Sequence, residues 1–124
     1  MTNEIFGWVC ILASVAMGLW MGLKFQHEHW LGGYASLARR MVRLAHIALA
    51  ALGVVNIEFA RTVNELVLSR AVIECISLSF MVAAVSMPVC CLLIAKSFRR
   101  FEIFALPIGS LALALLLTIG GLLR

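Results

Sequence analysis

Residues 71–95 read AVIECISLSFMVAAVSMPVCCLLIA, a run of 25 residues in which Glu74 is the only charged side chain. A helix rises about 1.5 Å per residue, so about 20 residues are needed to cross about 30 Å of hydrocarbon. This run is therefore long enough to span a bilayer. Three other apolar stretches of suitable length occupy residues 5–23, 41–60 and 101–123. The sequence predicts a single transmembrane domain, residues 1–124, with four spans.

The composition and the pattern of the apolar residues favour helices as the spanning elements. Hydrophobic residues make up 64% of the chain and charged residues 13%, whereas soluble domains have about 45–50% and about 25%. Backbone in lipid must satisfy its own hydrogen bonds, which leaves helices or a closed barrel. Stretches such as 82–95 lack the alternation of a barrel strand. We expect an all-α, up-down four-helix membrane bundle.

The basic residues gather beside the ends of the spans and predict an orientation. Seven follow the first and third spans, at Lys24, Arg39, Arg40, Arg43, Lys96, Arg99 and Arg100, and three lie at the opposite end, at Arg61, Arg70 and Arg124. The positive-inside rule then places both termini on the non-cytoplasmic side. We expect an integral protein of the bacterial cytoplasmic (inner) membrane. Its basic excess would contact membrane lipids, with no nucleic acid as a partner.

His46 is the side chain best suited to ligand binding or proton transfer, because it lies inside the second predicted span. Polar groups within a membrane usually face the bundle interior. The reading we favour is a hydrogen bond to another helix. Histidine is also a common axial ligand of b-type haem, so a haem, quinone or proton-relay site remains an alternative. In a haem site, the second ligand would be His27 or His29 of the same chain, or the His46 of a second copy across a dimer. The propionates would then meet Arg39, Arg40 and Arg43.

Small residues recur at helical spacing in the predicted spans. Ser14, Gly18 and Gly22 repeat every four residues, a spacing that lets two helix backbones approach closely. The sequence predicts tight helix packing, with the partner in this chain or another, at Ser14, Gly18, Gly22, Gly53, Ser79 and Ser86. The four cysteines lie inside spans without a CxxC pair, so no metal site is predicted.

Three other polar side chains fall within the spans or at their ends. Asn56 is expected to hydrogen-bond between helices. Glu58 lies three residues before Arg61, and Glu74 lies four residues after Arg70. These spacings predict local ion pairs at the outer interface. A proton-coupled carboxylate is the alternative for either glutamate.

No nucleophile–base pair or hydrolase, kinase or zinc-protease motif is visible, so we expect no enzymatic activity. The composition favours a small non-catalytic integral subunit or assembly factor of a larger membrane complex, with respiratory or electron-transfer complexes as candidate hosts. The sequence also allows the chain to associate with copies of itself as a homo-oligomer. The alternatives are a b-type haem or quinone protein centred on His46, and a small proton-coupled transporter.

In length and number of spans the chain resembles the small multidrug resistance exporters. That resemblance implies transport driven by a glutamate in the middle of the first span. Here the first span has Glu4 at its mouth and Ser14 near its middle, so the residue that would carry transport is not present at that position.

Overall fold

The structure is a computed structural model that describes residues 2–96 and 100–123. Its four α-helices are α1 (Thr2–Lys24), α2 (Leu37–Thr62), α3 (Arg70–Ala95) and α4 (Ala105–Leu122). Short 3₁₀ turns lie at Trp30–Gly32 (η1), Val63–Glu65 (η2) and Phe101–Phe104 (η3). The described residues contain no strand, so the all-α prediction is confirmed. All four helices, α4 together with η3, are long and apolar enough to cross a membrane.

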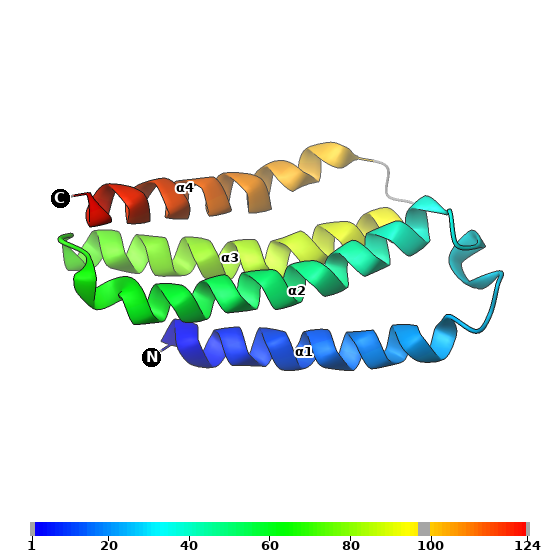
Figure 1. Ribbon diagram of the computed structural model, residues 1–124. Helices are drawn as coiled ribbons and strands as arrows, with labels where there is room; N and C mark the ends of the chain where they lie inside the picture. The colour runs from blue at the N-terminus through cyan, green and yellow to red at the C-terminus, as the bar shows by residue number, and fades with distance from the viewer. Residues whose placement is uncertain (1, 97–99, 124) are drawn as a thin grey trace.

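The helices run alternately in opposite directions, and the N- and C-terminal ends lie at the same end of the molecule (Figure 1). Each helix packs on its neighbour in sequence, while α1 touches α3 only lightly. Among the described residues α1 and α4 do not pack along each other, so they form the two edges of the array (Figure 1). Because lipid tails are as apolar as leucine, no hydrophobic force closes such an array in a membrane.

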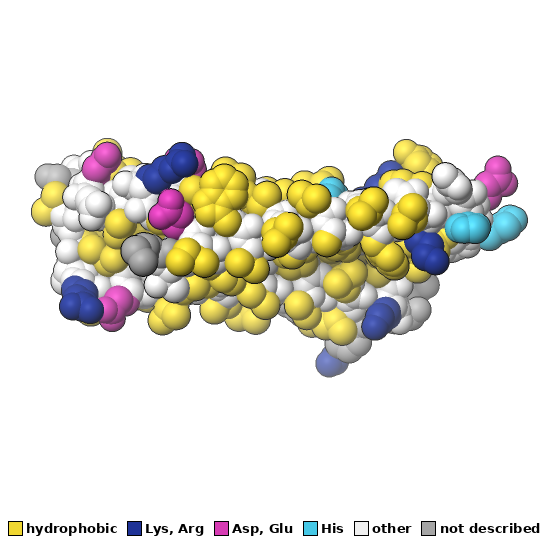
Figure 2. Space-filling model, turned by 90° about the horizontal axis from the view of Figure 1, so that it is seen from below, with side chains coloured by type: hydrophobic (Ala, Val, Ile, Leu, Met, Phe, Trp, Pro, Cys, Tyr) yellow, Lys and Arg dark blue, Asp and Glu magenta, His cyan; other side chains and the backbone are white. Residues whose placement is uncertain are grey.

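Charged side chains lie at the two ends of the molecule, and apolar side chains cover the band between them (Figure 2). One end holds the loop after α1 and the turn after α3. It carries six described cations, Lys24, Arg39, Arg40, Arg43, Lys96 and Arg100, against two carboxylates, Glu28 and Glu102. We call it the cationic end. The opposite end carries two described cations and four carboxylates, namely Arg61, Arg70, Glu4, Glu58, Glu65 and Glu74. This distribution is typical of a membrane-spanning protein.

The backbones of α1 and α2 touch at a pair of glycines. A Cβ atom added to Gly7 would lie 2.5 Å from the carbonyl oxygen of Gly53, and one added to Gly53 would lie 2.8 Å from the carbonyl oxygen of Gly7. Real Cβ atoms do not approach backbone so closely. Both positions therefore require glycine, and the crossing brings the side chains on either side of it within hydrogen-bonding distance.

The loop between α1 and α2 turns through three residues of positive φ: Leu31 at 55°, Gly32 at 81° and Gly33 at 92°. Glycine adopts such angles freely, whereas leucine does so at a cost. The hydroxyl of Ser36 holds the strained residue, because it donates to the carbonyl of Leu31 at 2.6 Å. The same hydroxyl accepts from the backbone N–H of Arg39 at 3.1 Å and caps the start of α2.

Candidate functional site

His46 and Ser14 join α1 to α2 through two reciprocal hydrogen bonds. The Ser14 hydroxyl donates to the backbone carbonyl of His46 at 3.0 Å. The His46 Nδ1 atom lies 2.9 Å from the Ser14 carbonyl oxygen and 3.1 Å from its hydroxyl. Because the single hydroxyl proton is already used, Nδ1 carries the hydrogen and donates to the Ser14 carbonyl. The contact with Ser14 does not involve Nε2.

Gly18 completes this contact one turn further along α1. A Cβ atom at Gly18 would lie 2.9 Å from Cε1 of His46. The edge of the imidazole therefore rests on the glycine backbone, and Ser14 and Gly18 together hold the ring. Gly22, the next residue of the predicted stripe, faces open space on the outside of the helix.

The residues of one chain do not fit a haem held by two histidines. His46 does not line the three apolar grooves formed by residues such as Leu44, Met81 and Ile5 in the described part of the chain. His27 and His29 lie exposed in the loop after α1. Within the described ranges, no three His, Cys, Asp or Glu side chains gather closely enough to hold a metal ion. What the geometry supplies at His46 is a link between helices.

A second polar centre ties three helices together around Asn56, which is fully buried. The Asn3 Nδ2 group of α1 donates to Asn56 Oδ1 at 2.9 Å and to the Ser77 carbonyl of α3 at 3.3 Å. The Ser77 hydroxyl donates to Asn3 Oδ1. The Asn56 Nδ2 group donates to the carbonyl of Leu52 at 2.8 Å and to that of Phe80 in α3 at 3.4 Å. Each amide oxygen and nitrogen of this network therefore has a partner.

Asn3 and Ser77 were not among the residues singled out from the sequence. Asn3 lies at the very start of the first apolar stretch, where a polar residue is unremarkable. Sequence alone does not pair residues that lie 53 and 74 positions apart.

Arg39 lies at the cationic end, within a cage of aromatic rings. Its guanidinium carbon is 4.8 Å from the ring centre of Phe25 and 5.5 Å from those of Trp30 and Tyr34. The side chain donates to the Phe25 carbonyl at 3.3 Å, and its Nε has no hydrogen-bond partner. Arg43, which the sequence assigned to a propionate, lies over Tyr34 at 5.0 Å. Cation–π contact thus replaces an anion as the partner of these two arginines.

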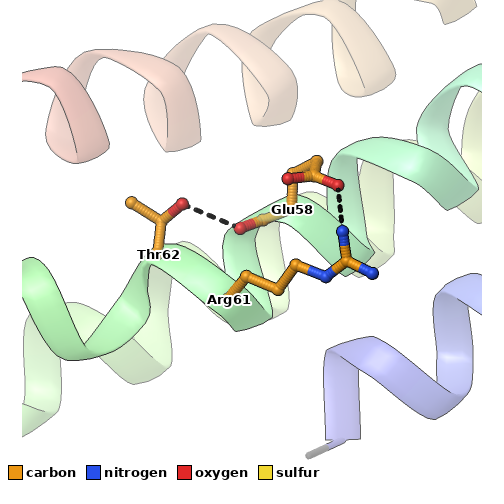
Figure 3. Close-up of polar contacts among 3 residues, drawn as sticks. All are labelled: Glu58, Arg61 and Thr62. Carbon is orange, nitrogen blue, oxygen red and sulfur yellow. Dashed lines mark hydrogen bonds and ion pairs between the residues drawn. The ribbon is translucent and has the colours of Figure 1, made fainter.

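Glu58 and Glu74 lie at the other end of the molecule, on the surface. Arg61 pairs with Glu58 at 3.0 Å, and the Thr62 hydroxyl donates to the Glu58 carbonyl at 2.9 Å (Figure 3). Arg70 pairs with Glu74 at 3.0 Å. The glutamate side chains are 58% and 63% exposed. Neither carboxylate points into the interior of the bundle.

The small residues of α3 have separate roles. The Ser86 hydroxyl donates to the Val82 carbonyl of its own helix at 2.6 Å. Ser79 is half-buried, and Ala83 between them is completely buried. Ser86 therefore satisfies its hydroxyl without a second helix.

An apolar groove of about 520 Å³ lies between α2 and α4, with α3 beneath it. Its walls include Leu44, Ile47 and Leu52 of α2, Met87 of α3, Phe104 of η3 and Ile108 of α4. The groove follows from the open arrangement of the helices, because α4 packs along α3 and does not pack along α2.

In comparisons with known proteins, no family model matches this chain, and no curated protein or solved structure matches it significantly. The fold and the site define a class: an α-helical protein with four helices long and apolar enough to cross a membrane, three of which are linked by hydrogen bonds of polar side chains.

Proposed function

We propose that this protein is a small non-catalytic integral membrane subunit or assembly factor of a larger membrane protein complex. The observation that carries the proposal is that polar groups between its helices form hydrogen bonds to one another. His46 bonds to Ser14, and Asn56 bonds to Asn3. Among the described residues, Nε of Arg39 is the one buried side-chain polar atom without a partner. These hydrogen-bonded side chains therefore contribute to the packing of the helices against one another.

The outer face of α4 supports a lateral partner. Helix α4 packs on α3, and its buried face includes Pro107, Ala114 and Gly121, of which Gly121 lies against Leu66 and Leu68 in the segment before α3. The opposite face carries Gly109, Leu113, Leu116 and Gly120, and a Cβ atom at either glycine would meet nothing within 4 Å. Small residues on an exposed helix face let another transmembrane helix approach closely. We propose this outer face of α4 as the docking surface for another integral subunit.

The charge distribution supports an orientation as well as a location. The cationic end would face the cytoplasm under the positive-inside rule, with both chain termini on the other side. We propose the bacterial inner membrane as the location, with respiratory or electron-transfer complexes as candidate hosts.

Haem or quinone binding and proton-coupled transport have less support from the geometry. Nε2 of His46 would be available to a ligand, but His46 lines none of the three apolar grooves, and His27 and His29 lie exposed in the loop after α1. Glu58 and Glu74 are exposed and ion-paired, whereas a transport carboxylate would be expected within the bundle. We therefore put neither function forward.

The test compares two glycines that both face open space. Gly109→Trp places an indole on the outer face of α4, and Gly22→Trp places one on α1. Neither Cβ position contacts other atoms within 4 Å, so both variants should keep wild-type helicity by circular dichroism. After gentle extraction from native membranes, mass spectrometry should find the wild type with larger integral polypeptides in fixed stoichiometry. We expect Gly109→Trp to lose them and Gly22→Trp to keep them. A wild-type protein that purifies as a solitary particle would overturn the proposal.

A further inference from the structure

The groove between α2 and α4 needs an occupant in a membrane. Its walls are apolar side chains from α2, α3, η3 and α4. An empty space would deprive these side chains of dispersion contacts on one side. Water would find no hydrogen-bond partner there, because a bound water needs several polar partners.

The size of the groove selects the kind of occupant. The groove has a volume of about 520 Å³. A transmembrane helix with its side chains is about 10–12 Å across, so it would cover the groove from outside instead of entering between α2 and α4. A single extended hydrocarbon chain is thin enough to enter it.

Two exposed arginines stand where the groove reaches the cationic end. Arg40 lies four residues, and so one helical turn, before Leu44 on the same face of α2. Arg100 directly precedes Phe101, which also lines the groove. The ion pairs of the described residues involve Arg61 and Arg70 only.

Among the described residues, the cations at this end outnumber the carboxylates by six to two. Glu28 and Glu102 are exposed, and neither lies within ion-pair distance of a cation in the described part of the chain. Arg39 adds a buried guanidinium that contacts aromatic rings instead of a carboxylate. An anion at the mouth of the groove would therefore experience several cations and few competing carboxylates.

We propose that the groove binds one acyl chain of an anionic phospholipid whose phosphate lies between Arg40 and Arg100. Basic pockets between transmembrane helices are known to take acidic lipid headgroups. The apolar walls accept the chain and the two arginines select the charge of the headgroup. This site lies beside α3 and is separate from the outer face of α4, so it does not depend on the proposed subunit function.

The first test measures selectivity for the headgroup. The full-length protein is equilibrated with phosphatidylglycerol or phosphatidylcholine of identical acyl chains, and retained lipid is counted by native mass spectrometry. We expect one phosphatidylglycerol to be retained preferentially. A cation at the headgroup level is worth about fivefold in binding, so Arg40→Gln/Arg100→Gln should lower the retention of phosphatidylglycerol about 30-fold.

A matched double variant distinguishes specific binding of the headgroup from general electrostatic attraction by the cationic end. Lys24→Gln/Lys96→Gln removes the same charge from the same end, at exposed positions that do not line the groove: Lys24 is the last residue of α1, and Lys96 directly follows α3. We expect it to retain phosphatidylglycerol nearly as the wild type does. Equal losses in the two double variants would overturn the proposal, as would equal retention of the two lipids by the wild type.

The second test fills the groove and leaves the arginines in place. Leu44→Trp adds bulk to a lining side chain that is 41% exposed, and Leu12→Trp is the control on the outer side of α1, 69% exposed. We expect Leu44→Trp to lose bound phosphatidylglycerol and Leu12→Trp to keep it, with unchanged helicity in both. Two results would contradict the proposal: a dimer or a co-purified helix that Leu44→Trp removes, or displacement of the lipid by inorganic phosphate alone.

Discussion

The two halves of the molecule are held together in different ways. Helix α2, in the middle of the array, has 44% of its most apolar stretch buried, whereas α4, with η3, has 11%. The α1–α2–α3 half is linked by the Ser14–His46 and Asn3–Asn56 hydrogen bonds. In α4 the Thr118 hydroxyl donates to the Ala114 carbonyl of its own helix. The polar residues of the spans are concentrated where helices must hold each other.

This difference shows which contacts stabilise the association of apolar helices in lipid. Lipid solvates an exposed leucine as well as a neighbouring helix does, so apolar contact alone gives little preference for association. Close backbone packing and interhelical hydrogen bonds supply that preference instead. We therefore expect substitutions in the α1–α2–α3 half to cost more than substitutions in α4.

The largest expected effect is at the glycine crossing. Gly53→Val places a branched side chain against the Gly7 carbonyl and within 3.1 Å of the Cβ of Cys10. Helix α1 must shift, and we expect a loss of about 3 kcal/mol or more in the free energy of unfolding. The measurement is SDS-induced unfolding in mixed micelles, followed by circular dichroism.

Gly120→Val is the matched control for this change, because its Cβ position meets no other atom within 4 Å. The smaller variant Gly53→Ala should show an intermediate loss if the valine variant does not fold. Equal stability of Gly53→Val and Gly120→Val would show that α1 and α2 do not cross in backbone contact.

The next effect is at the three-helix junction. Asn56→Ala removes the partner of Asn3 and the bonds to the Leu52 and Phe80 carbonyls. Interhelical hydrogen bonds in membranes average about 0.6 kcal/mol and reach about 1.7 kcal/mol, so we expect a loss of about 2 kcal/mol. Asn64→Ala, at an exposed position in η2, is the control in the same unfolding assay. If Asn56→Ala lowers the free energy of unfolding no more than Asn64→Ala does, the hydrogen bonds of Asn56 do not stabilise the protein.

The smallest effect is expected in α4. Thr118→Val replaces a hydroxyl that bonds within its own helix by a methyl group of similar size. We expect a change below about 0.5 kcal/mol, because no bond between helices is lost. Should this variant unfold as readily as Asn56→Ala, the contrast between the two halves of the molecule would fail.

Much of the architecture was predictable because the bilayer restricts the choices. Stretches such as 71–95 and 101–123 are too apolar for water and too long for a soluble core strand, and backbone in lipid must form helices. The five residues 96–100 leave no room for a crossing, so α3 and α4 had to be antiparallel neighbours. The spacing of Arg70 and Glu74 likewise led to a pair that the structure contains.

The interior contacts were less accessible to sequence reasoning. His46 was expected to bond to another helix, but its partner Ser14 was assigned only to a packing stripe. Asn3 and Gly7 were not singled out, because their roles exist only where α1 crosses α2. Arg39 was counted with the surface cations, yet the loop folds over it and leaves it 3% exposed.

The sequence by itself determined that the chain forms four apolar helices with its cations gathered at one end, since hydropathy and span length act locally along the chain. Only the tertiary structure decided which helices are fastened by hydrogen bonds, which glycines touch, and that α4 stands apart from α2 with a groove between them. These features depend on the rotation and the offset of one helix against another. In a membrane those are set by close packing and hydrogen-bond geometry, which the apolar pattern does not encode.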